Sequence, residues 1–153
     1  MTKRSFRFFA VAVSATALAV TTAAAPTVSP PKPTITVYKD PNCGCCKNWI
    51  EHLIKHGYRV EAKDTPDMAQ IKNTLGVPSG LTSCHTAVVE GYLIEGHVPA
   101  ADIDRLLATK PKVKGLAVPG MPMGSPGMEG AMKQQYQVIA FDRTGKTRIV
   151  ASY

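Results

Sequence analysis

Thiol groups are the most reactive feature of this sequence. Three of its four cysteines, Cys43, Cys45 and Cys46, are nearly consecutive, and Cys84 follows later beside His85. Core packing does not explain such crowding of thiols. A thiolate is both a nucleophile in disulfide exchange and a ligand for soft metal ions. The spacing therefore predicts redox chemistry, a soft-metal site, or both.

A second set of soft donors comes from methionine. Met121, Met123 and Met128 lie in residues 115–129, a segment whose prolines and glycines argue against any regular core element. Thioether and thiolate donors together select Cu(I) over harder ions. If this loop folds over the thiols, the two sets form a copper site. The alternative is a loop whose thioethers only dock on the core.

Other readings of the cysteines stay open at this point. Two structural disulfides would suit an oxidising compartment, but a bond between the neighbours Cys45 and Cys46 would be strained. A structural zinc site made of all four cysteines lacks the usual paired spacing of its ligands. An iron–sulfur cluster is disfavoured further by the export signal that the N-terminus carries. His52 and His56, one helical turn apart, are a further candidate metal pair, and a hairpin could bring His97 near the cysteines.

The elements that must position these groups alternate between strand and helix. Predicted strands cover residues 34–38, 58–63, 86–90 and 92–97. Predicted helices run from Cys43 to the stop at Gly57, over residues 67–75, and over residues 99–109. A last hairpin covers residues 135–142 and 146–152. This order predicts a thioredoxin-like α/β fold with a Met/Gly/Pro-rich loop and a C-terminal β-hairpin.

Such a fold places the first cysteine of a Cys-x-x-Cys pair at a helix N-terminus, where free N–H groups favour a thiolate. Cys43 and Cys46 have that spacing, so we expect Cys43 to be reactive and Cys46 to be its resolving partner. Thioredoxins carry a cis-proline opposite this pair. Here Ser83, Cys84 and His85 take its place. A fourth sulfur is therefore expected to face the other three.

The N-terminus has the layout of a secretory signal peptide. Basic residues precede an apolar run over residues 8–20, and small residues follow at 23–25. The run is shorter than the roughly 20 residues that span a bilayer. We expect residues 1–25 to be a cleaved signal peptide, residues 26–33 a Pro-rich tether, and residues 34–153 one domain. The mature protein should be periplasmic and not membrane-embedded.

Charge argues against a nucleic-acid partner. Removing the three basic residues of the signal peptide lowers the formal net charge from +7 to +4. The remaining basic residues are scattered and few aromatic residues stand among them, which is not the footprint of a nucleic-acid-binding surface.

Taken together, the Cys-Gly-Cys-Cys turn, the Cys84-His85 pair and the methionine segment of residues 115–129 resemble the DUF411 family. This family is catalogued as a domain of unknown function, and its named member acts in periplasmic copper resistance. The resemblance spans essentially the whole mature domain. It implies a thioredoxin-like fold and a copper site that holds several ions bridged by sulfur. The ligands it implies are Cys43, Cys45, Cys46 and Cys84, supported by His85, Met121, Met123 and Met128.

We therefore expect a periplasmic copper-binding protein of copper resistance and homeostasis, which captures Cu(I) through thiolates and releases it when a disulfide forms. Copper, as Cu(I) or Cu(II), is the predicted metal, and other periplasmic copper-handling proteins are candidate partners. Two enzymatic alternatives stay open. One is a thiol–disulfide oxidoreductase that uses Cys43 and Cys46 as catalytic residues, and the other is a copper oxidoreductase.

Overall fold

The computed structural model describes residues 31–153. The predicted signal peptide, residues 1–25, lies outside the described residues, as do residues 26–30 of the predicted tether. None of the helices in residues 31–153 combines the length and the apolar character that crossing a membrane requires.

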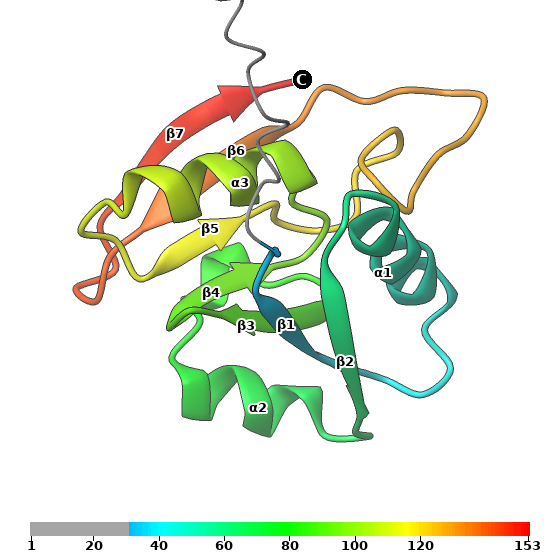
Figure 1. The fold of residues 1–153 in the computed structure, drawn as a ribbon, viewed down its shortest axis with the longest axis horizontal. Helices are drawn as coiled ribbons and strands as arrows, with labels where there is room; N and C mark the ends of the chain where they lie inside the picture. The colour runs from blue at the N-terminus through cyan, green and yellow to red at the C-terminus, as the bar shows by residue number, and fades with distance from the viewer. Residues whose placement is uncertain (1–30) are drawn as a thin grey trace, which may run out of the picture.

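The described chain folds around one seven-stranded mixed sheet. The strands are β1 (Thr34–Lys39), β2 (Arg59–Asp64), β3 (His85–Val89), β4 (Tyr92–Glu95), β5 (Gly115–Ala117), β6 (Gln137–Phe141) and β7 (Thr147–Ser152). The helices are α1 (Gly44–Lys55), α2 (Met68–Leu75), α3 (Ala100–Thr109) and the short 3₁₀ turn η1 (Ser79–Leu81). The sheet order is β2-β1-β3-β4-β5-β6-β7, as Figure 1 shows. The β1–β2 and β4–β5 pairs are parallel and the others antiparallel.

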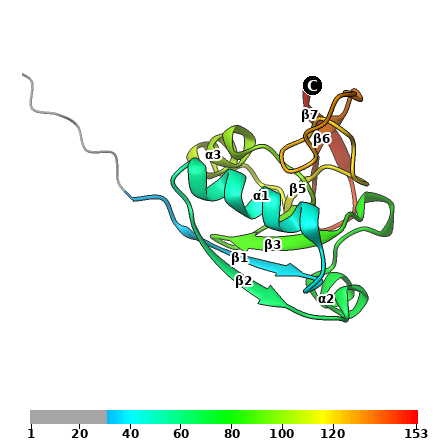
Figure 2. The same ribbon diagram turned by 90° about the vertical axis from the view of Figure 1, so that its right-hand side faces the viewer.

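Helices cover both faces of the sheet. In Figure 2, α1 and α3 lie on one face and α2 lies on the other. Trp49 and Leu53 of α1 join Ile103 and Leu106 of α3 in the main core cluster. A smaller cluster on the opposite side contains Val77, Leu81, Leu93, Ala117 and Phe141. Because burying one large apolar side chain stabilises the fold by about 1.5–3 kcal/mol, this two-sided burial fixes the sheet that presents the cysteines.

The start of α1 is set by Cys43. This residue has extended backbone at φ −71° and ψ 100°, and its sulfur accepts the Cys46 N–H, as a helix cap does. The buried residues Cys46, Trp49 and Leu53 then recur at intervals of three and four, which gives the helix one apolar face. Gly57 follows the helix at φ +86°, a left-handed conformation that suits glycine.

The predicted α/β class is confirmed, and the predicted helices and strands agree with the observed ones within a few residues. One prediction was wrong. The glycine- and proline-rich segment was expected to be irregular throughout, but its first residues, Gly115–Ala117, form β5 between β4 and β6. An added Cβ at Gly115 would lie 2.0 Å from the Leu93 carbonyl oxygen. Glycine thus allows the close approach of two backbones that makes this strand possible.

Candidate metal centre

The N-terminus of α1 places the three neighbouring cysteines at one end of the sheet. Cys43 and Cys46 are joined by a disulfide, with Cys46 fully buried and Cys43 partly buried. Cys45 carries a free thiol. The structure therefore shows the site in an oxidised state, in which the first and last cysteines of the motif are paired and the middle one is not.

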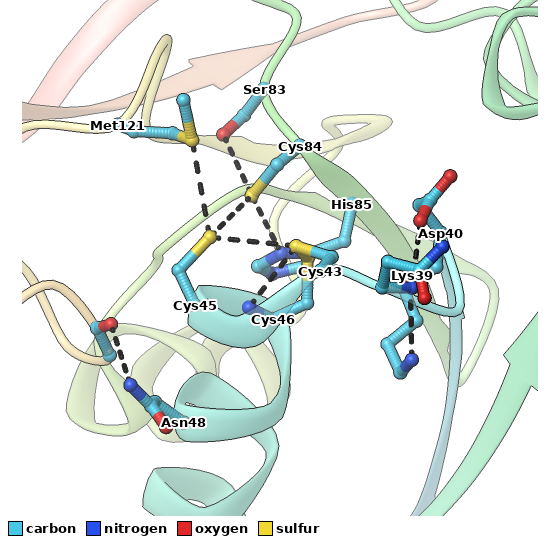
Figure 3. The surroundings of a disulfide bond; sticks show 12 residues. Lys39, Asp40, Cys43, Cys45, Cys46, Asn48, Ser83, Cys84, His85 and Met121 are labelled. Carbon is cyan, nitrogen blue, oxygen red and sulfur yellow. Dashed lines mark hydrogen bonds between the residues drawn. A yellow bond between two sulfur atoms is a disulfide. The ribbon is translucent and has the colours of Figure 1, made fainter.

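Cys84 approaches this group from the loop before β3. Its sulfur lies 3.7 Å from the Cys45 sulfur, and the Cys45 sulfur lies 3.5 Å from that of Cys43 (Figure 3). The sulfurs of Cys43, Cys45, Cys46 and Cys84 all lie within 4.8 Å of one another. The fourth sulfur therefore faces the other three, as expected from the sequence. No cis peptide bond occurs among the described residues, so Cys84 follows an all-trans backbone.

A buried ion pair holds the backbone beside Cys84. The Ser83 N–H donates to Glu95 Oε1 at 2.7 Å. The same oxygen accepts from the Lys72 ammonium at 2.5 Å, and Thr86 donates its hydroxyl proton to Glu95 Oε2 at 2.6 Å. Burial raises the pKa of Glu95, and the neighbouring charge of Lys72 opposes that rise. Because both carboxylate oxygens are bonded, Glu95 ties α2 and the hairpin to the loop that presents Cys84.

The Cys84 thiol is a weak acid in this environment. Burial raises its pKa to about 12, with further contributions from the nearby Cys45 sulfur and the hydrogen bond to it. Cys84 therefore holds its proton at neutral pH in the absence of a cation. A metal ion that binds this sulfur must displace the proton.

Two imidazoles also contact the Cys84 sulfur. His85 Nδ1 lies 3.3 Å from it, and His97 Nε2 lies 3.2 Å from it. The pKa of each ring is lowered, mainly because the ring is buried. His97, expected to end a strand that a hairpin could bring near the cysteines, does lie beside them. Cys84, His85 and His97 form a second group whose donor atoms lie within 4.8 Å of one another.

The hairpin register explains why His97 lies there. Thr86 pairs with Glu95 across the β3–β4 hairpin, so the same register continued outward places Cys84 opposite His97. The turn at Glu90 and Gly91, both at positive φ, fixes this register. The sequence indicates the turn at Gly91, but the prediction did not extend the strand register from this turn to Cys84 and His97. Glu95 and Lys72 were missed altogether, although a charged residue inside the apolar hairpin was a signal that a buried partner exists.

The methionine loop reaches the cysteines through one side chain. The Met121 sulfur lies 4.0 Å from that of Cys45, and 52% of Met121 is exposed. Figure 3 draws this contact as a dashed line. Within residues 31–153, Met123 and Met128 make no hydrogen-bonding contact with a cysteine. The backbone of Met123 bonds Gln134, and Met128 bonds back within its own loop. Their predicted ligand roles have no contact in this structure to support them.

Close packing fastens the loop to α1. Gly127 has φ +85°, and a Cβ there would lie 2.7 Å from the Trp49 nitrogen and 2.9 Å from the Cys45 carbonyl oxygen. The Asn48 amide donates to the Gly127 carbonyl at 3.5 Å. Next to it, the Pro126 carbonyl accepts from His97 Nδ1 at 2.8 Å. Only glycine fits at position 127, and this fit keeps the loop beside the thiols.

His52 and His56, the alternative metal pair on α1, each bond a backbone group. His52 Nε2 accepts the Ala100 N–H at 3.1 Å and so caps α3. His56 Nδ1 donates to the His52 carbonyl at 2.8 Å at the end of α1. Neither residue belongs to a group of three or more potential metal-binding side chains found among the described residues.

Comparison with known proteins identifies the family. The profile of a family described as a protein of unknown function, DUF411, matches residues 81–128, which include Cys84, His85 and the methionine loop. Two solved structures are similar over most of the chain, and both carry the name copper resistance protein CopG. Form 2 has a TM-score of 0.76 and form 1 a TM-score of 0.75. Each is 48% identical in sequence, and the match covers 80% of this chain and 98% of theirs.

The chain belongs to the DUF411 family. No curated protein sequence gives a significant match. The two CopG matches cover 80% of this DUF411 protein, so they extend beyond residues 81–128, the part that the family profile matches.

The donor set suits copper. Four sulfurs of cysteine and one of methionine are soft ligands, and soft ligands favour Cu(I) over harder ions. Imidazole nitrogens beside Cys84 extend the set to donors that copper also accepts. The carboxylate of Glu95, which accepts the Ser83 N–H beside Cys84, is occupied by Lys72 and Thr86. The DUF411 site thus offers sulfur and nitrogen rather than the oxygen ligands that Mg²⁺ and Ca²⁺ require.

Proposed function

We propose that this protein is a periplasmic copper-binding protein of copper resistance and homeostasis. It binds Cu(I) through Cys43, Cys45, Cys46 and Cys84, with Met121 and His85 in support. The observation that carries the proposal is the gathering of four cysteine sulfurs within 4.8 Å of one another. The similarity to proteins named for copper resistance supports the choice of metal.

Copper is the cargo of this site. Thiolates bridge Cu(I) ions readily, so four sulfurs at these distances can share more than one ion. Because Cys84 holds its proton at neutral pH, each ion that binds it releases that proton to solvent. Met121 is half-exposed and its sulfur contacts that of Cys45, so in this proposal it is the donor through which an incoming ion first meets the thiols.

The oxidation state of Cys43 and Cys46 controls loading. The disulfide between them removes two of the four thiolates. A dithiol reductant opens it by thiol–disulfide exchange, passing two electrons to the pair and becoming a disulfide itself. The reduced protein then binds copper with its full set of sulfurs. The reverse exchange, in which a disulfide-bearing oxidant takes up the two electrons and becomes a dithiol, closes the bond and returns the site to the state in which only Cys45 and Cys84 are free.

A thioredoxin-like origin accounts for the position of the site. Support comes from the order β1-α1-β2-α2-β3-β4-α3 and from a Cys-x-x-Cys pair that begins a helix. In this proposal the first part of the chain is a thioredoxin-like unit, and β5, β6 and β7 extend its sheet beyond β4. The Met/Gly/Pro-rich loop between β5 and β6 is the added segment that reaches the cysteines.

A periplasmic location, reached through a cleaved signal peptide at residues 1–25, completes the proposal. The basic and apolar N-terminal pattern supports it. Other periplasmic copper-handling proteins are the proposed donors and acceptors of the ion. A disulfide-permissive compartment is also where control by Cys43 and Cys46 would operate.

Competition with a chromophoric Cu(I) chelator tests this function. We expect the reduced protein without residues 1–25 to bind more than one Cu(I), counted by elemental analysis. Cys43→Ser and Cys84→Ser should each weaken binding strongly. A Ser79→Ala variant, changed at an exposed residue away from the site, is the matched control and should bind as the parent does. Equal binding by all these variants would refute the four-sulfur site.

A second candidate function is thiol–disulfide oxidoreduction with Cys43 as nucleophile and Cys46 as resolving residue. The observation that favours it is the disulfide between them at the N-terminus of α1. Cys84→Ser separates the two functions. A dithiol enzyme keeps its exchange activity in this variant, whereas the copper site loses a ligand.

A further inference from the structure

We infer that Cys84, His97 and His85 form a distinct one-ion copper site, which stays complete while Cys43 and Cys46 are joined in the disulfide. The inference rests on the proposed function for the identity of the metal. It goes further by assigning His97 as a ligand and by giving the oxidised protein a site of its own.

Distances among the three donors carry the first step. The Cys84 sulfur lies 3.2 Å from His97 Nε2 and 3.3 Å from His85 Nδ1. The donor atoms of this group all lie within 4.8 Å of one another. Copper and zinc bind imidazole nitrogen at about 2.0 Å and thiolate sulfur at about 2.3 Å, so an ion fits among these atoms after small outward shifts of the side chains.

The hydrogen bond of His97 orients it as a ligand. Its Nδ1 lies 2.8 Å from the Pro126 carbonyl oxygen, which can only accept. The ring proton of the neutral imidazole therefore resides on Nδ1. The lone pair of Nε2 faces the Cys84 sulfur. A backbone carbonyl behind the far ring nitrogen is the usual arrangement for a metal-binding histidine.

Burial of His85 leaves one of its ring nitrogens unpaired. The ring is fully buried, and its Nε2 has no hydrogen-bond partner of normal geometry among the described residues. The ring packs on Trp49 with 4.4 Å between centroids, a role that an apolar ring would fill as well. A buried polar atom that stays unpaired destabilises the folded protein. Its other nitrogen, Nδ1, contacts the Cys84 sulfur and is the ligand atom in the proposed site.

Independence from the disulfide follows from the residues involved. Cys84 is a free cysteine, and both histidines contact this residue, which takes no part in the disulfide between Cys43 and Cys46. When the disulfide closes, the four-sulfur set loses two donors but this set loses none. One thiolate and two imidazoles also accept Cu(II), which an all-sulfur set disfavours. The oxidised protein therefore keeps one copper ion in either oxidation state.

Cobalt provides a test in the oxidised protein, because Co(II) does not reduce the disulfide and gives a thiolate charge-transfer band when it binds sulfur. We expect one Co(II) per chain, with this band and the strong visible absorption of a tetrahedral ion, and displacement by Zn(II). His97→Ala should abolish the band. His56→Ala, an exposed histidine outside the group, is the matched control and should leave it unchanged. A Cys43→Ser/Cys46→Ser double variant should keep it.

A measurement on the parent protein covers the case in which His97→Ala does not fold. In long-range ¹H–¹⁵N spectra of the oxidised protein, Zn(II) should shift the resonances of His97 Nε2 and His85 Nδ1 and leave those of His52 in place. Absence of the cobalt band, a band unaffected by His97→Ala, or zinc shifts confined to other histidines would each overturn the inference. Cu(I) binding by the four cysteines of the reduced protein is measured separately, so its failure is distinguishable from failure here.

Discussion

Replacing Gly127 by alanine should lift the methionine loop from α1. The residue has φ +85°, and the new Cβ would lie 2.7 Å from the backbone nitrogen of Trp49 and 2.9 Å from the Cys45 carbonyl oxygen. Both neighbours are backbone atoms of a helix and cannot rotate away. The loop must therefore move, and the bonds to Gly127 from Asn48 and to Pro126 from His97 are the first to weaken.

The magnitude has two parts. A left-handed conformation costs a non-glycine residue about 1–2 kcal/mol. The two hydrogen bonds at risk contribute about 0.5–1.5 kcal/mol each, or about 1–3 kcal/mol together. We expect Gly127→Ala to lower the free energy of unfolding by about 2–5 kcal/mol. The matched control is Gly120→Ala in the same loop, where φ is +68° but no atom lies within 4 Å of the new Cβ.

Urea unfolding followed by tryptophan fluorescence measures both variants, because Trp49 lies in α1 beside the contact. Gly120→Ala should show only the conformational part of the loss, about 1–2 kcal/mol. The difference between the two variants reports the close approach of loop and helix. Equal destabilisation of the two would show that the loop does not pack on α1 as described, and would remove the argument that Gly127 holds it beside the thiols.

The remaining predictions concern the surroundings of Cys84. Glu95→Gln should destabilise the fold by about 3–5 kcal/mol in urea unfolding, since it leaves the Lys72 ammonium buried without its counter-ion, and adding Lys72→Met should restore most of the loss. Chelator competition from pH 6 to 9 should show that the Cu(I) affinity rises with pH. Because the pKa of Cys84 is raised to about 12, its thiol loses one proton for each ion bound, and this adds about tenfold to the Cu(I) affinity per pH unit. The contribution of Cys84 to this pH dependence should be absent in Cys84→Ser. Met121→Leu should weaken Cu(I) binding about tenfold or less, whereas Met132→Leu, at a residue that is 74% exposed, should have no effect.

Most of the fold could be predicted because most helices and strands carry start and stop signals in their own sequence. The Cys43 cap and Gly57 mark the two ends of α1, and Gly76, at φ +70°, ends α2. β5 was missed because it has only three residues and begins with glycine, so it shows no alternation of its own. Its strand character comes from pairing with β4 and β6 on either side, which is a tertiary effect.

The site was predictable where the chemistry is concentrated in the sequence. Crowded thiols and a later Cys-His pair pointed to one sulfur-rich site, and the four sulfurs do lie together. The position of His97 depended on a hairpin register that the turn at Gly91 already fixes. The Lys72–Glu95 pair joins a helix to a strand across the sheet. No local pattern specifies that contact, so only the folded structure shows what holds Ser83 and Cys84 in place.

Copper X-ray absorption spectroscopy of the reduced, Cu(I)-loaded protein tests the proposed four-sulfur site most directly, because it identifies the atoms bound to the ion. The proposal predicts a first shell dominated by sulfur, with fewer sulfur neighbours per copper in Cys84→Ser. It also predicts that the protein with the disulfide between Cys43 and Cys46 intact holds less copper, since only Cys45 and Cys84 then remain free. A first shell of nitrogen and oxygen in the reduced protein, unchanged in Cys84→Ser, would contradict it.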